Sequence, residues 1–196
     1  MGAIEVTHEA LNARLRDATP DSALAFGASC LYRVLPLIDA CSTSRVDPAS
    51  KERLLAPGLD EKGMHGCLRE LGNTVQEPSF PVGCEELGDA PAMAGEIVLR
   101  GLAPGFVLRE WADWASTLTL DISQEFDAML DESDSHGVVF RPAGENADLT
   151  PMEFAELHEQ VRTLSLLAER PRDEPELDEL IRAGARRTAD TLTHLT

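Results

Sequence analysis

The feature that most constrains this chain is the apolar segment ALAFGASCLYRVLPLIDAC, residues 23–41. On a helix, at about 100° per residue, it leaves only a thin polar stripe of Ser22, Ser29 and Arg33. A helix that is apolar nearly all round is normally buried in a protein core. The segment is too short and too interrupted to span a bilayer, which takes about 20 predominantly apolar residues. We therefore predict a central core helix, kinked at Pro36 because proline removes one backbone donor.

Composition favours helices over sheet. The chain has 196 residues, of which 43% are apolar, and leucine and alanine outnumber valine, isoleucine and the aromatic residues. Leucine and alanine favour helices, whereas β-branched and aromatic residues favour strands. This apolar content can build a core, and the length fits one domain. We predict a single helical domain over residues 1–196.

Capping signals and apolar periodicity divide the rest of the chain into helices. Thr19-Pro20 and Asp47-Pro48 each join an N-cap residue to a first-turn proline, and residues 150–153, TPME, form a capping box. Gly72 is expected to stop one helix. The expected helices cover approximately residues 7–17, 20–41, 48–55, 60–71, 91–102, 107–130, 151–168 and 176–192. These predict an all-α bundle of about seven or eight helices, with loops at residues 73–88 and 131–148.

The last two expected helices should pair with each other. Their apolar stripes are Phe154, Leu157, Val161, Leu164 and Ala168 in the first, and Leu177, Leu180, Ile181, Ala185, Ala189 and Leu192 in the second. A short turn flanked by prolines joins them, which predicts a C-terminal antiparallel hairpin over residues 150–196, within the bundle or as a subdomain. Gly184 interrupts the second stripe. Small residues there either weaken the helix or let a neighbouring helix approach closely.

The net charge of −18 excludes some classes of partner. Nucleic acids and anionic membranes are bound through Lys and Arg, so this surface repels both. It attracts a basic protein, a cationic ligand or metal ions. The alternative is that the charge only keeps the protein soluble.

The acidic residues are concentrated between Asp121 and Glu153. This stretch holds nine acidic residues against Arg141 alone. Beside two tryptophans, such a patch suits a basic partner, because charge steers the encounter and an aromatic side chain anchors it. The candidate partner-binding residues are Trp111, Trp114, Asp121, Glu125, Asp131, Glu132 and Asp134. The alternative is that the tryptophans are core residues and the acids a solvated face.

Patterns that resemble catalytic or metal sites are all incomplete. His158-Glu159 begins like a zinc-peptidase helix, but Arg162 stands where the second histidine belongs. The loop at residues 131–137 lacks the acidic residue that a calcium loop needs at its twelfth position. Three further candidate ligands, His65, Cys67 and Cys84, are not spaced as structural zinc sites are. No phosphate-binding glycine loop or nucleophile elbow occurs. We predict no catalytic residue, cofactor or metal.

Cysteine usage indicates a reduced environment. The four cysteines are Cys30, Cys41, Cys67 and Cys84. Cys30 and Cys41 would lie roughly 16 Å apart along one helix, too far for a disulfide. The first residues lack the basic and apolar regions of a signal peptide. A cytoplasmic protein is the simplest interpretation.

One segment resembles a known family. Residues 25–36, AFGASCLYRVLP, resemble the opening of the bacterial DUF416 (YjaG-like) family, which also starts with an Ala-Phe-small-small helix ending in Arg-x-Leu-Pro. Residues 64–71, MHGCLREL, and 111–115, WADWA, look like later helices of that family. The chain departs from the family pattern after Asp131. The resemblance implies a small helical fold and no particular activity, because the family is functionally uncharacterised.

Three functions fit these observations. The favoured one is a non-enzymatic, acidic protein-binding module of the inhibitor or immunity type, which masks a basic partner surface such as the substrate groove of a nuclease toxin. The second is a helical enzyme or small-molecule binder with an interhelical pocket that uses Arg33, His65 or Trp111. The third is a structural homo-oligomer, such as a homodimer, paired through residues 150–196. A polar cluster inside an apolar cavity would favour the second function over the first.

Overall fold

The computed structural model of the protein describes residues 5–42, 44–75, 84–131, 149–169 and 175–195. Within these ranges the chain forms eight α-helices, one 3₁₀-helix and no strand, so the all-α prediction is confirmed. The elements are α1 (His8–Asp17), α2 (Pro20–Ala40), α3 (Pro48–Leu55), α4 (Glu61–Val75), η1 (Cys84–Leu87), α5 (Ala90–Gly101), α6 (Leu108–Leu130), α7 (Pro151–Glu169) and α8 (Pro175–Leu195).

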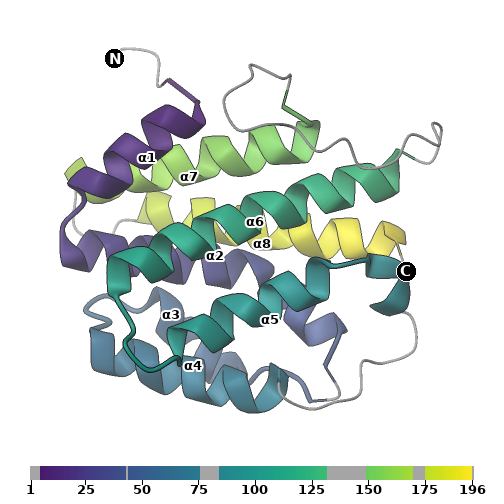
Figure 1. The fold of residues 1–196 in the computed structure, drawn as a ribbon, viewed down its shortest axis with the longest axis horizontal. Coiled ribbons are helices and arrows are strands. Elements are labelled where there is room, and N and C mark those ends of the chain that lie inside the picture. Colours follow the sequence, from purple (N-terminus) through teal and green to yellow (C-terminus); the bar gives the residue numbers. More distant parts are fainter. Residues whose placement is uncertain (1–4, 43, 76–83, 132–148, 170–174, 196) are drawn as a thin grey trace.

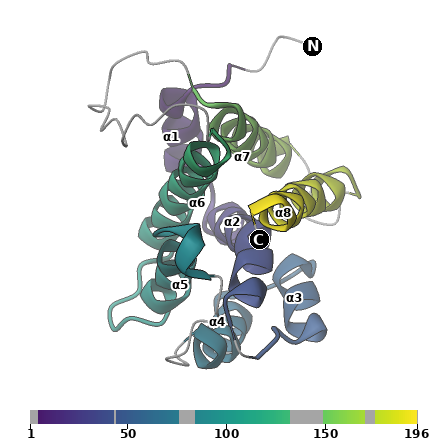
Figure 2. The ribbon, with the colours of Figure 1, turned by 90° about the vertical axis from the view of Figure 1, so that its right-hand side faces the viewer.

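Helix α2 is the centre of the bundle, as its composition predicts. It packs against every helix from α3 to α8, and Figures 1 and 2 show these helices arranged around it. Its 21 residues are long and apolar enough to cross a membrane, so the expectation that it is too short was wrong. Its most apolar window is 83% buried inside the bundle. Burial by other helices, rather than length, is what identifies it as the core helix.

The two helix starts signalled by an N-cap residue and a proline are confirmed, because Thr19 and Asp47 are the N-caps of α2 and α3. Thr7, which was expected as the first helical residue, is the N-cap of α1. Each side chain accepts a hydrogen bond from the backbone N–H three residues later, at 3.1 Å in all three cases. A cap of this kind satisfies a donor that the first helical turn leaves unpaired. Local chemistry alone therefore places these three starts.

The expected stop at Gly72 was wrong, because α4 continues to Val75. Gly72 is buried, and a Cβ placed on it would lie 2.7 Å from Leu102 Cδ1. The missing side chain thus makes room for a neighbouring residue instead of ending the helix. The strand-like residues 138–140 and most of the two expected loops lie outside the described residues.

The start of α7 is capped by another helix as well as by its own residues. Glu153 accepts from Thr150 N–H at 3.2 Å, which is one half of the expected capping box. The other half does not form, because the Thr150 hydroxyl is buried without a partner. Instead, Asp127 Oδ2 on α6 accepts from Met152 N at 2.8 Å and from Glu153 N at 3.4 Å. This carboxylate joins the end of α6 to the start of α7.

The C-terminal helices α7 and α8 pack against each other and also against α2. Their buried residues belong to the same apolar cluster as those of the other helices, from Leu11 to Leu192. The expected stripe of α7 is partly wrong, because Phe154 is 50% exposed and Ala168 is exposed. Polar residues take part of the inner face instead: Glu153, Glu156, Glu159, Gln160 and Thr163. The residues of the turn between the two helices, 170–174, lie outside the described residues.

Candidate partner-binding surface

The outward side of α6 carries a row of carboxylates, here named the acidic stripe. Its members are Glu110, Asp113, Asp121, Glu125 and Asp131. The first four fall within about a third of the helix circumference, and Asp131 is the C-cap that follows the helix. The row extends over about 30 Å at 1.5 Å per residue. Glu110, Asp113 and Asp131 are exposed, and Asp121 and Glu125 are half-buried. Figures 1 and 2 show α6 at the outside of the bundle, with α2 behind it.

Within the described ranges, no Lys or Arg forms an ion pair with Glu110, Asp113, Asp121 or Glu125. The one cation of α6, Arg109, donates to the backbone carbonyl of Ala18 at 2.8 Å. The exposed and partly buried ion pairs outside the interior involve other helices: Lys51–Asp39, Arg53–Glu70, Arg100–Glu96, Arg162–Glu176, Arg182 with Glu52 and Asp178, and Arg186–Glu179. Ion pairing therefore leaves the charge of these four stripe carboxylates uncompensated.

The surroundings of Asp121 disfavour its ionised form. Burial raises its pKa, the charge of Glu153 raises it further, and His8 opposes both effects. Glu153 is itself buried, and it accepts from Gln124 Nε2 at 2.7 Å while His8 Nε2 lies 3.6 Å from its Oε1. Asp121 is thus a half-buried carboxylate beside a second carboxylate.

We expect Asp121→Asn to stabilise the protein at neutral pH. A raised pKa means that the folded protein holds the Asp121 proton more tightly than the unfolded chain does, so the ionised form opposes folding. The penalty fades as pH falls through the folded-state pKa toward the unfolded value of about 3.9. Thermal melts should show a higher Tm for the variant at pH 7 and no difference below about pH 4.

Asp113→Asn is the matched control, because Asp113 is an exposed carboxylate of the same stripe. It should raise the Tm less than Asp121→Asn does. Equal Tm shifts in both variants at every pH would show that the ionised form of Asp121 is no more costly in the folded protein than that of the exposed Asp113.

The two tryptophans have different roles. Trp111 is only 3% exposed, and its Nε1 donates to the Ile97 carbonyl at 2.9 Å. Its ring lies so close to Gly27 that a Cβ there would come within 2.8 Å of Trp111 Cε3. Trp111 is therefore a core residue, and its assignment as an anchor for a partner is corrected.

Trp114 lies at the edge of the acidic stripe, one turn after Glu110, and is half-buried. The guanidinium of Arg100 on α5 covers its ring, 3.8 Å from the ring centroid. Its Nε1 is buried and has no hydrogen-bond partner. Trp114 therefore stays a candidate anchor beside the stripe, while the other two candidates, Glu132 and Asp134, lie outside the described residues.

A buried charge network, which sequence reasoning missed, lies behind α6. Arg33 of α2 is 0% exposed, and its Nε donates to Glu156 Oε1 at 3.0 Å. Its Nη2 lies 3.4 Å from Cys30 Sγ, and its Nη1 is buried without a partner. Burial lowers the pKa of Arg33, but the charges of Glu156, Cys30 and Glu159 and the Glu156 hydrogen bond outweigh it, so the pKa is raised.

The network continues into α7, α8 and α6. Glu156 also accepts from Arg187 Nη2 at 3.1 Å and from Gln160 Nε2 at 2.9 Å, and Arg187 donates to both oxygens of Glu159. Ser116 donates to Gln160 Oε1 at 2.6 Å. Two arginines thus balance two glutamates in the interior. Two features of the sequence could have indicated this network: Arg33 in the thin polar stripe of α2, and Gly184 within α8. In the structure Gly184 faces Arg33 and Glu159.

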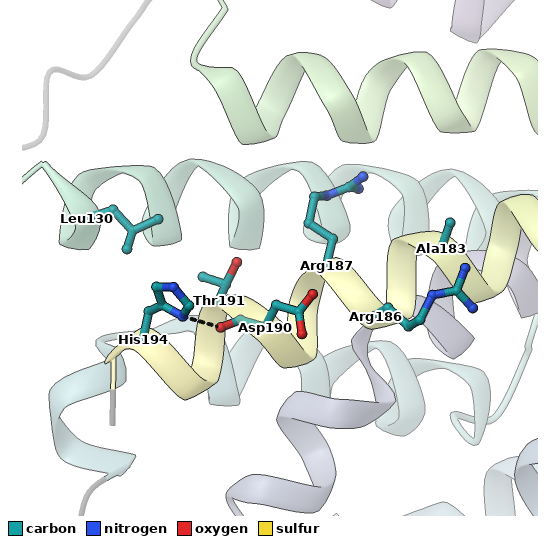
Figure 3. Close-up of a pocket in the computed structure, with 7 residues that line it drawn as sticks. All are labelled: Leu130, Ala183, Arg186, Arg187, Asp190, Thr191 and His194. Atoms are coloured by element: carbon teal, nitrogen blue, oxygen red, sulfur yellow. Dashed lines mark hydrogen bonds between the residues drawn. The ribbon is translucent and has the colours of Figure 1, made fainter.

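An open hollow of about 380 Å³ lies between the ends of α6 and α8 (Figure 3). Its lining residues are Leu130, Ala183, Arg186, Arg187, Asp190, Thr191 and His194. Figure 3 shows the Arg187 side chain turned away from Arg186 and Asp190, in keeping with its bonds to Glu156 and Glu159. Arg186 is paired with Glu179. Both arginines of the hollow are therefore already neutralised by carboxylates.

The candidate metal ligands do not converge in the part of the chain that the structure describes. No group of three or more His, Cys, Asp or Glu side chains there could hold a metal ion. His158 stacks on Phe154, with ring centroids 6.5 Å apart, and His65 contacts the edge of Phe106. Cys67 is buried in the core.

Comparisons of the chain with protein-family models, with curated proteins and with solved structures found no match. The resemblance to the DUF416 (YjaG-like) family therefore stays a prediction.

Proposed function

We propose that this protein is a non-enzymatic binding module that masks a basic surface of a partner protein with the acidic stripe of α6. The observation that carries the proposal is that four of the stripe's carboxylates, Glu110, Asp113, Asp121 and Glu125, have no Lys or Arg ion-pair partner in the described chain. A row of uncompensated charge speeds the encounter with an oppositely charged surface and selects against acidic partners. A nuclease toxin with a cationic substrate groove is a partner of the right chemistry.

The stripe offers an anchor as well as a charge. Trp114 presents part of an indole ring one turn after Glu110, and tryptophan is among the side chains most often found at energetically dominant contacts. Charge would bring the partner to α6, and burial of Trp114 would then slow dissociation. A partner cation placed beside Asp121 would relieve the repulsion from Glu153, which together with burial raises the pKa of Asp121.

The small-molecule alternative has weaker support. Ligand sites usually bury most of the ligand in a largely apolar cleft with a few free polar groups. The hollow between α6 and α8 is open, and both of its arginines are engaged by glutamates. The homo-oligomer alternative stays a prediction, which a mass measurement in solution would decide.

We expect neutralisation of the stripe to weaken binding of a basic probe by about tenfold. The variant is Asp113→Asn/Asp121→Asn/Glu125→Gln, and the probe is a lysine-rich peptide whose binding is followed by tryptophan fluorescence. Exposed charge pairs contribute roughly 0.5 kcal/mol each, so three of them give about a tenfold change in Kd. Binding of the unmodified protein should also weaken steeply with salt, because exposed charges are screened within about 8 Å at physiological ionic strength.

The matched control is Asp17→Asn/Glu61→Gln/Glu169→Gln, which removes the same charge from exposed positions on other helices. It should change the Kd by much less than the stripe variant does. If both triple variants weaken binding equally, the net charge and not the stripe attracts the probe. Salt-insensitive binding would contradict the proposal outright.

A further inference from the structure

Two of the four cysteines come together from distant parts of the chain. Cys41 is the C-cap of α2, and Cys84 is the first residue of the 3₁₀-helix η1. The Cys84 thiol donates to the carbonyl of Ala40, the residue directly before Cys41, at an Sγ–O distance of 3.6 Å. Both cysteines are free, and their exposed fractions are only 6% and 7%. The end of α2 and the start of η1 therefore hold two reduced thiols side by side.

The thiols also affect each other electrostatically. Burial raises the pKa of Cys41, and the hydrogen bond and charge of the neighbouring Cys84 thiol raise it further. No other thiol contributes to the pKa shift of Cys30 or of Cys67. Burial raises the pKa of Cys30 to about 12 beside Arg33, and Cys67 lies near Arg53 and Glu70.

We propose that Cys41 and Cys84 are an oxidation site, at which hydrogen peroxide converts the two thiols to a disulfide that ties the end of α2 to η1. In the first step the sulfur of Cys84 attacks the peroxide, the O–O bond breaks, and a sulfenic acid and one water form. The sulfur of Cys41 then attacks the sulfenic sulfur, the S–O bond breaks, and hydroxide leaves with the thiol proton as a second water. Two thiols and one peroxide thus give one disulfide and two waters.

The roles of the two cysteines follow from their surroundings. Cys84 begins the four-residue 3₁₀-helix η1, whereas Cys41 ends the long central helix α2. Local opening of the short element exposes Cys84 first, so Cys84 is the thiol that meets peroxide, and Cys41 is the resolving thiol, which attacks as its thiolate. Because both thiols are buried, their oxidation should be slow at neutral pH. It should be faster in mild urea, which favours local opening of η1.

The test is peptide mapping of the intact protein after treatment with hydrogen peroxide and alkylation of the remaining thiols. Trypsin places the four cysteines on four separate peptides, residues 17–33, 34–45, 63–69 and 70–100. We expect mass spectrometry to find peptide 34–45 linked to peptide 70–100, and the link to disappear on reduction. A link to peptide 17–33 or 63–69, or oxidation of Cys84 to sulfinic acid without any link, would overturn the proposal.

Two variants separate the pair from general thiol oxidation. Cys67→Ala should keep the link, whereas Cys41→Ala should leave Cys84 as a sulfenic acid that dimedone traps. The oxidised wild-type protein should also melt at a higher temperature than the reduced protein, because the link restricts the unfolded chain between residues 41 and 84. A gain in Tm of the same size in Cys41→Ala would contradict the assignment.

Discussion

Replacement of Arg33 by methionine is expected to lower the free energy of unfolding by about 3–5 kcal/mol. Arg33 is fully buried, and its main partner, Glu156, is 2% exposed. Methionine can fill much of the space but cannot balance the charge, so Glu156 keeps only Arg187 and Gln160. A buried carboxylate that loses a cation is penalised heavily because water cannot reach it. Urea unfolding followed by circular dichroism measures the loss.

The double variant Arg33→Met/Glu156→Leu tests whether charge or packing causes that loss. Removing both charges leaves Arg187 with Glu159 and turns the centre of the network apolar. Buried ion pairs replaced by apolar residues of similar volume often cost little, so the double variant should be more stable than Arg33→Met alone. If the loss in the double variant equals the sum of the losses in Arg33→Met and Glu156→Leu, the ion pair is not the source of the effect.

The second large effect is expected at Gly184, where alanine should cost about 1–3 kcal/mol of stability. A Cβ at this position would overlap Arg33 Cδ and lie 2.5 Å from Glu159 Oε2. Both neighbours are held by the buried network and cannot move aside without breaking ion pairs. The extra methyl group must therefore push α8 away from α2 and α7.

Gly66→Ala is the matched control for Gly184→Ala. Gly66 lies inside α4, and nothing is within 4 Å of a Cβ placed on it. In a helix interior alanine is favoured over glycine by about 1 kcal/mol, so this variant should be slightly more stable than the wild type in the same urea titration. A loss at Gly66 equal to the loss at Gly184 would show that the close contact is not responsible.

The acidic stripe was partly predictable from the sequence, and the buried charge network was not. The excess of carboxylates after Asp121 is visible as composition, and helical spacing places several of them on one side of α6. Whether a cation from another helix neutralises them depends on where the other helices lie. Nothing in the sequence distinguishes Glu156 from the many other acidic residues of this chain. Only the approach of α2 and α8 turns it into the buried partner of Arg33 and Arg187.

The local elements of the fold are determined by the sequence itself. The caps Thr7, Thr19 and Asp47 act on backbone groups three residues away, and the apolar run of α2 makes it a core helix wherever the other helices pack. Other features were decided only by the tertiary structure. The burial of Trp111, the cap that Asp127 provides for α7 and the contact of the Cys84 thiol with the end of α2 all join residues on different elements. Signals for helices extend over a few residues, whereas these contacts exist only once distant segments have packed together.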